Sequence, residues 1–71
     1  MPPQKKEEVV LSQREKDILD FLSKGYTAPD IAKALGLSHE TIRWYRKRLI
    51  AKFDVANTAE LISTTKEMGL I

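Results

Sequence analysis

The chain contains no cysteine and only one histidine among its 71 residues. Without cysteine it has neither disulfide bonds nor a thiolate metal site, so packed helices or a second copy of the chain must stabilise its small core. We find no paired carboxylate and histidine set, metal-ligand cluster or glycine-rich phosphate loop. We therefore expect neither catalysis nor a bound metal, cofactor or small-molecule ligand. No apolar run approaches the roughly 18 residues of a membrane span or resembles a signal-peptide core, so we expect a cytoplasmic protein.

Positive charge is concentrated in one segment. The whole chain has a net charge of +2, but residues 39–52 carry five cationic side chains and one acidic one, a balance of +4. The other residues therefore sum to −2. A basic segment on a slightly acidic body favours a localised anionic partner over general adhesion to polyanions.

The first ten residues, MPPQKKEEVV, have the proline and charge content of a flexible leader or the end of a linker. Residues 11–71 contain four stretches with helix-start signals, which predict helices over 13–24, 28–35, 39–52 and 58–68. Their expected N-caps are Ser12, Thr27, Ser38 and Asn57. No stretch alternates apolar and polar residues as a strand does, so we predict one all-α domain of four helices.

The spacing of three small or branched residues defines the junction of the second and third helices. Ala32 allows two helices to cross closely, Gly36 permits the positive φ that reverses the chain, and Ile42 covers the crossing. This spacing is typical of a helix-turn-helix, whose second helix lies in the major groove of DNA. An ordinary αα-hairpin inside a helical bundle is the alternative reading.

The helix over 39–52 has two different sides. At about 100° per residue, its larger apolar side chains form an inward stripe about 80° wide, made by Ile42, Tyr45, Leu49 and Phe53. Opposite that stripe lie the side chains that we expect next to DNA bases, which are Arg43, Trp44 and Lys47. On the flanks lie the expected phosphate contacts Arg46, Arg48 and Lys52. The alternatives are a solvated basic face and a Trp44 that folds against a neighbouring side chain.

Several short motifs occur in order along the chain: LSQRE at 11–15, GYT at 25–27, DIA at 30–32, LGLS at 35–38, TIR at 41–43 and KF at 52–53. With them the chain resembles the LuxR-type DNA-binding domain, also called GerE-like or NarL/FixJ-type, over about residues 11–65. The resemblance implies a bacterial transcriptional regulator whose third helix reads double-stranded DNA and whose fourth helix forms a dimer on a two-fold-related site. It also implies backbone contacts from Thr41 and Lys52. We add the cap residues Thr27 and Ser38 to the candidate phosphate contacts.

Four positions depart from the family pattern. Tyr45 stands where histidine is common, Trp44 where a smaller residue is usual, Thr58 where arginine is frequent and Ala28 where asparagine is frequent. The substitutions at positions 44 and 45 put the preferred DNA sequence in doubt. The receiver or ligand-sensing domain that usually precedes such domains is absent, so the chain is either a piece of a longer regulator or a small stand-alone one.

The fourth helix and the residues after it carry more apolar surface than a terminal helix needs, and we expect part of it to form the homodimer contact, through Leu61, Ile62 and Met68. RNA polymerase is a further candidate partner. One alternative function is a promoter- and polymerase-binding domain similar to region 4 of a sigma factor. Another is a protein-interaction adaptor that has kept the fold and lost DNA binding.

Overall fold

The computed structural model describes residues 9–71, which form four helices and no strand. The helices are α1 (Gln13–Ser23), α2 (Ala28–Leu35), α3 (His39–Phe53) and α4 (Thr58–Glu67). Each predicted boundary lies within one residue of the observed one, and the all-α prediction is confirmed. Most of the expected leader, residues 1–8, lies outside the described residues.

The first two helices begin at the expected N-caps Ser12 and Thr27, each of which exchanges reciprocal hydrogen bonds with an acidic residue of the first turn. The Glu15 N–H donates to Ser12 Oγ at 3.1 Å, and the Ser12 N–H donates to the Glu15 carboxylate at 2.9 Å. Thr27 and Asp30 exchange the same pair of bonds at the start of α2. The hydrogen bonds from the Thr27 side chain and backbone hold the pKa of the Asp30 carboxyl below its ordinary value.

The other two helices begin with a single capping side chain each. Ser38 Oγ accepts a hydrogen bond from the Thr41 N–H at 3.1 Å, and Asn57 Oδ1 accepts one from the Glu60 N–H at 2.9 Å. The Glu60 carboxylate reaches back one residue further than in a capping box, because it accepts from the Ala56 N–H at 2.7 Å. Since these caps satisfy otherwise unpaired backbone donors, they fix where each helix starts.

The turn between α2 and α3 depends on Gly36. Its φ of +69° and ψ of 35° are left-handed, and the next N–H, of Leu37, donates to the Ala32 carbonyl at 2.9 Å. An added Cβ would contact nothing within 4 Å, so conformation and not space favours glycine here. Ala32 and Ile42 are both buried beside the turn, as the helix-turn-helix spacing predicted.

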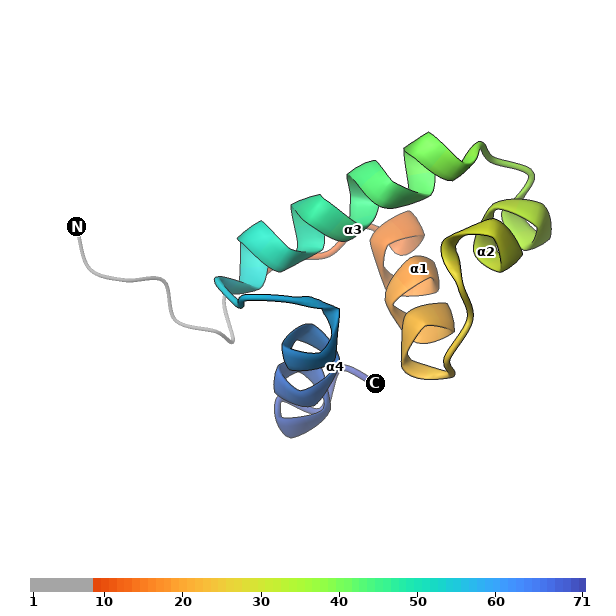
Figure 1. Ribbon diagram of the computed structural model, residues 1–71. Coiled ribbons are helices and arrows are strands. Elements are labelled where there is room, and N and C mark those ends of the chain that lie inside the picture. The colour runs from red at the N-terminus through yellow and green to blue at the C-terminus, as the bar shows by residue number, and fades with distance from the viewer. Residues whose placement is uncertain (1–8) are drawn as a thin grey trace.

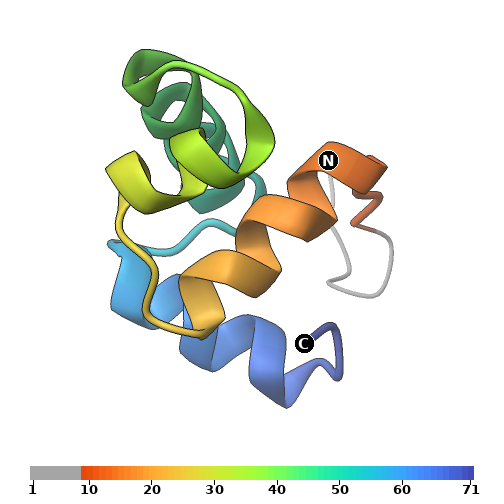
Figure 2. The same ribbon diagram turned by 90° about the vertical axis from the view of Figure 1, so that its right-hand side faces the viewer.

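The core lies on one side of α3. In Figure 1, α3 runs across one side of the domain with the other helices beneath it, and it packs against all three. In the view of Figure 2, α1 lies between α4 and the pair formed by α2 and α3. All four helices contribute to the buried apolar cluster, which contains Ile18, Leu19, Leu22, Ile31, Ala32, Ile42, Leu49, Phe53 and Leu61.

Three side chains are buried to a different extent than the sequence alone suggests. Tyr45, expected on the inward stripe of α3, is only partly buried at the edge of the core. Leu61, an expected dimer contact, is fully buried within this chain and presents no side-chain surface to a partner. Thr65 is also fully buried, and its hydroxyl donates to the Leu61 carbonyl at 2.8 Å within α4.

Candidate nucleic-acid interface

The outer side of α3 is uncovered by the rest of the domain. Arg43, Trp44 and Lys47 are exposed there, while Ile42 and Leu49 of the same helix are fully buried in the core. Arg46 lies partly buried on one flank. The structure therefore brings the three residues predicted to lie near DNA bases onto one surface, and the apolar stripe fixes the direction in which that surface points.

Trp44 is held between two neighbours and remains 55% exposed. Its ring meets the Tyr45 ring edge-on, with centroids 5.0 Å apart and an interplanar angle of 81°. The Arg48 guanidinium lies 5.3 Å from the centroid of the indole ring, within the range of a cation–π contact. Trp44 thus folds against neighbouring side chains and still presents more than half of its surface to solvent.

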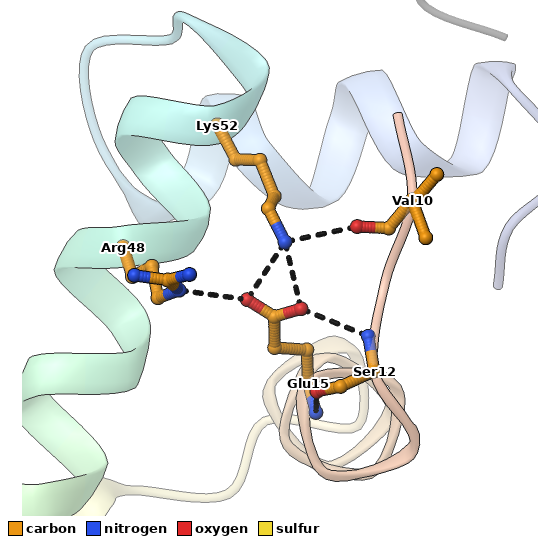
Figure 3. A network of polar contacts seen from close by, with 5 residues as sticks. All are labelled: Val10, Ser12, Glu15, Arg48 and Lys52. Carbon is orange, nitrogen blue, oxygen red and sulfur yellow. Dashed lines mark hydrogen bonds and ion pairs between the residues drawn. The ribbon is translucent and has the colours of Figure 1, made fainter. Parts of the chain in front are cut away.

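The flank of α3 that faces α1 contains an ionic network centred on Glu15 (Figure 3). Lys52 Nζ lies 2.8 Å and 3.0 Å from the two Glu15 carboxylate oxygens and donates to the Val10 carbonyl at 2.9 Å. Arg48 Nε lies 3.3 Å from Glu15 Oε2. The Glu15 side chain is only 4% exposed. Glutamate is rarely buried to this extent unless it is paired, and here Lys52 and Arg48 are its partners. The network therefore ties the N-terminus of α1 to the last two turns of α3.

Two opposing influences act on the pKa of the Glu15 carboxyl. Burial raises this pKa because it disfavours the charged form. The hydrogen bonds from Lys52 and Ser12, together with the Lys52 charge, lower it, and their sum outweighs burial. The net result is a pKa below the ordinary value, so Glu15 is ionised at neutral pH and neutralises one positive charge of α3.

A shallow depression of about 450 Å³ lies beside this network. Val10, Leu11 and Ser12 line it from the α1 side. The α3 side is lined by Trp44, Tyr45, Arg48 and Lys52. The depression therefore adjoins the exposed face of α3 and belongs to the same candidate site.

The hydroxyl residues that we expected to contact phosphates have roles as caps. Thr27 Oγ1 accepts from the Asp30 N–H at 3.3 Å at the start of α2. Ser38 Oγ and Thr41 Oγ1 lie 2.9 Å apart at the start of α3 and share a hydrogen bond. Any DNA contact made by these hydroxyls has to coexist with the caps.

Sequence reasoning missed the buried position of Glu15. Glu15 stands three residues after the expected N-cap Ser12, but its partner Lys52 lies 37 residues away in the sequence. The available signal is the basic Lys52 near the end of α3, which is expected from the sequence to contact the DNA backbone. Residues 9–71 contain no group of three or more potential metal ligands, and none of their helices is long and apolar enough to cross a membrane.

Comparison with known proteins identifies relatives of this domain. Residues 9–65 match the family described as GerE, bacterial regulatory proteins of the luxR family. The transcriptional regulatory protein TdiR of Thauera aromatica is 42% identical over 52 residues, which cover 73% of this chain and 23% of TdiR. The virulence regulator BvgA of Bordetella pertussis, described as a putative positive transcription regulator, is 38% identical over 61 residues, which cover 86% of this chain and 29% of BvgA.

Solved structures have the same arrangement of helices. VqmA of Vibrio cholerae in complex with ligand and DNA matches with a TM-score of 0.85 and 26% identity, covering 99% of this chain and 31% of that one. Phage VqmA in complex with DPO matches with a TM-score of 0.82 and 38% identity, covering 92% and 30%. The chain thus spans less than a third of the length of each of these relatives. The family match covers most of its residues, and so the chain belongs to the luxR family of bacterial regulatory proteins, whose helix-turn-helix DNA-binding domain its four helices form.

Proposed function

We propose that this domain binds double-stranded DNA sequence-specifically by inserting α3 into the major groove. The observation that carries the proposal is the outward surface of α3, where Arg43, Trp44 and Lys47 are exposed on the side away from the buried Ile42, Leu49 and Phe53. The major groove of B-DNA admits one α-helix and displays a different pattern of donors and acceptors for each base pair. Cationic side chains on the outward side of such a helix can donate to guanine, and the indole of Trp44 offers an apolar surface to a thymine methyl group.

Residues on the flanks of α3 are assigned to the DNA backbone. Arg46 and Arg48 supply charge, while Thr27, Ser38 and Thr41 supply hydroxyls near the N-termini of α2 and α3. Phosphate contacts of this kind fix the orientation of the helix in the groove and carry no base information directly. Lys52 was expected to join this group, but its ammonium already bonds to Glu15 and Val10.

The active form that we propose is a homodimer on a two-fold-related DNA site. The dimer contact would be made by Ile62 of α4 and by Met68 at its C-terminal end, both of which are partly buried. Leu61 cannot take part, because it lies wholly in the core. A two-fold dimer of this type places its recognition helices in successive major grooves about 34–36 Å apart. Analytical ultracentrifugation with and without DNA tests this assembly, and a strictly monomeric complex would contradict it.

The relatives support a role in bacterial transcription. TdiR and BvgA are described as transcription regulators, and VqmA was solved with DNA. We propose that this chain likewise regulates transcription in the cytoplasm, as the output domain of a response regulator or as a small stand-alone regulator. RNA polymerase is the candidate second partner. We propose no enzymatic activity for the domain.

Selection of bound sequences from a random duplex library tests the function most directly. The expected result is enrichment of a motif with two inverted half-sites whose centres lie about one helical turn apart. Enrichment of a single half-site would support sequence-specific DNA binding but contradict the proposed homodimer. No enrichment at all, together with capture of a protein partner by the same domain, would favour the adaptor function in place of DNA binding.

A further inference from the structure

Glu15 and its partners connect the core to the DNA-facing side of the domain. Glu15 belongs to the first turn of α1, whereas Lys52 and Arg48 belong to the flank of α3 next to the exposed Trp44. Burying a carboxylate is costly unless opposite charges and hydrogen bonds compensate it. The positions of these two cations are therefore tied to Glu15 before any DNA is present.

The Lys52 ammonium has no donor to spare. A lysine ammonium carries three N–H donors. Lys52 Nζ lies within 3.0 Å of three acceptors, which are the two Glu15 carboxylate oxygens and the Val10 carbonyl. Its side chain is 28% exposed. For Lys52 to bind a phosphate, it would have to leave Glu15 in a site where only Arg48 and the Ser12 N–H remain as partners.

Arg48 is arranged differently. Its side chain is 54% exposed, and its closest contact with Glu15 is made by Nε, at 3.3 Å. Within residues 9–71 its guanidinium donates no hydrogen bond to another residue, in contrast to the Lys52 ammonium. A guanidinium has five N–H donors in a planar fork, so the pairs on Nη1 and Nη2 remain available for a phosphate. The Trp44 ring, 5.3 Å from Arg48 Cζ, restrains the same guanidinium from another side. Glu15 and Trp44 together orient Arg48 without occupying its outer donors.

We propose that Glu15 is a positioning residue that sorts the two cations, withholding Lys52 from the DNA backbone while orienting Arg48 toward it. The attraction of α3 for phosphates is thereby set from α1. This inference rests on the proposed DNA binding and refines it, because it removes one expected phosphate contact and assigns a role to a residue outside the recognition helix. It also departs from the backbone contact that the family resemblance implied for Lys52.

The salt dependence of DNA binding tests the proposal. For each phosphate neutralised by the protein, the slope of log affinity against log salt steepens by about 0.9, which is roughly a 3.5-fold larger loss of affinity between 50 and 200 mM salt. Binding of one fixed duplex is measured for the wild type, Glu15→Gln, the double variant Glu15→Gln/Lys52→Gln, and Arg46→Gln. Glutamine at position 15 can still close the capping box, so the start of α1 is preserved.

We expect Glu15→Gln to steepen the slope by up to about 0.9, because Lys52 is released to a phosphate. Adding Lys52→Gln should remove that gain, because the released ammonium is gone. The slope should then be that of the wild type or slightly shallower, since Arg48 has lost the carboxylate that orients it. Arg46→Gln, the matched control on the opposite flank, should make the slope shallower by about 0.9. The inference is overturned if Glu15→Gln leaves the slope unchanged and the double variant loses as much slope as Arg46→Gln.

A second measurement uses the unmodified chain and so does not depend on any variant folding. The ¹H–¹⁵N correlations of the lysine ammonium groups are followed by NMR as the selected duplex is added. The Lys52 signal should keep its shift while that of Lys47 moves, and equal movement of both overturns the inference. If no duplex binds at all, the proposed function fails and this inference fails with it. If the domain binds DNA but Lys52 contacts a phosphate as Arg46 is expected to, only this inference fails.

Discussion

The two ends of the basic surface on α3 carry similar charge but differ in what holds that charge. Toward the N-terminal end, Arg43 and Lys47 are exposed cations opposite the core. Toward the C-terminal end, Arg48 and Lys52 pair with the buried carboxylate of Glu15. Sequence composition counts all four as equal contributors to DNA binding. The structure distinguishes them, because Lys52 would lose its bonds to Glu15 if it moved to a phosphate, whereas Arg43 and Lys47 have no such partner to leave in the described part of the chain.

The largest expected effect is on stability, and it compares one lysine from each end. Lys52→Gln leaves Glu15 buried without its closest partner, so we expect the free energy of unfolding to fall by about 3 kcal/mol, the low end for a broken buried pair because Lys52 is partly exposed. Lys47→Gln should change it by no more than about 0.5 kcal/mol, as at other exposed sites. Urea unfolding followed by circular dichroism measures both. If the two substitutions lowered the free energy of unfolding equally, the Glu15 network would not contribute to stability.

The next effect concerns DNA sequence preference, and here Lys47 of the N-terminal end should have the larger role. Replacing Lys47 with Ala should cost about 1–3 kcal/mol of discrimination between the selected site and a site mutated at the contacted base pair. Arg46→Ala should weaken both sites alike, because a phosphate contact carries no base information. Competition binding with matched duplexes separates these outcomes. Lys47 and Arg46 variants that behave identically would contradict the division into base and phosphate contacts.

The sequence was sufficient to predict the helices because their boundaries are set by local chemistry. Each helix begins with a capping side chain that accepts a hydrogen bond from the N–H three residues ahead, and these caps are Ser12, Thr27, Ser38 and Asn57. Four consecutive residues are therefore enough to predict where a helix starts. The helical period likewise predicted which side of α3 faces the core, apart from Tyr45, which lies partly buried at its edge.

The parts that could not be predicted depend on contacts between distant residues or on exceptions to polarity. Glu15 is buried because Lys52 and Arg48 lie beside it in the fold, and no local pattern indicates their proximity. Thr65 reads as a surface residue, yet it is buried and satisfied by carbonyls of its own helix. Leu61 appeared available to a partner because the sequence does not say how much of α4 the core covers.

The third prediction uses acid to break the C-terminal pairing. Because the pKa of Glu15 is lowered in the folded chain, its ionised form contributes stability that is complete above the ordinary glutamate pKa of 4.5. That contribution is lost as the pH falls through the lower, folded-state pKa. Glu15→Gln should therefore be less stable than the wild type by about 1–2 kcal/mol at pH 7. The difference should shrink below about pH 4, as thermal or urea unfolding across pH can show. A constant difference across that range would mean that the Glu15 charge contributes nothing.

The smallest expected effect on stability concerns Trp44, which lies next to Arg43 in the sequence and contacts Arg48 of the C-terminal end. It is the only tryptophan of the chain, so its fluorescence reports on this position alone. Arg48→Gln removes the guanidinium near the indole together with its partly exposed ion pair to Glu15. We expect an altered emission with a loss of about 1 kcal/mol of stability, since each of these exposed contacts contributes about 1 kcal/mol or less. Added DNA should change the emission of the wild type strongly, because the ring is 55% exposed on the proposed binding surface. Lys33→Gln, on α2, removes one charge and leaves the Tyr45 and Arg48 contacts of the indole in place. It should therefore change neither the emission of the free protein nor the response of that emission to DNA. An emission that responds to Arg48→Gln but not to DNA would place Trp44 in the Arg48 contact alone, and base reading would then fall to Arg43 and Lys47.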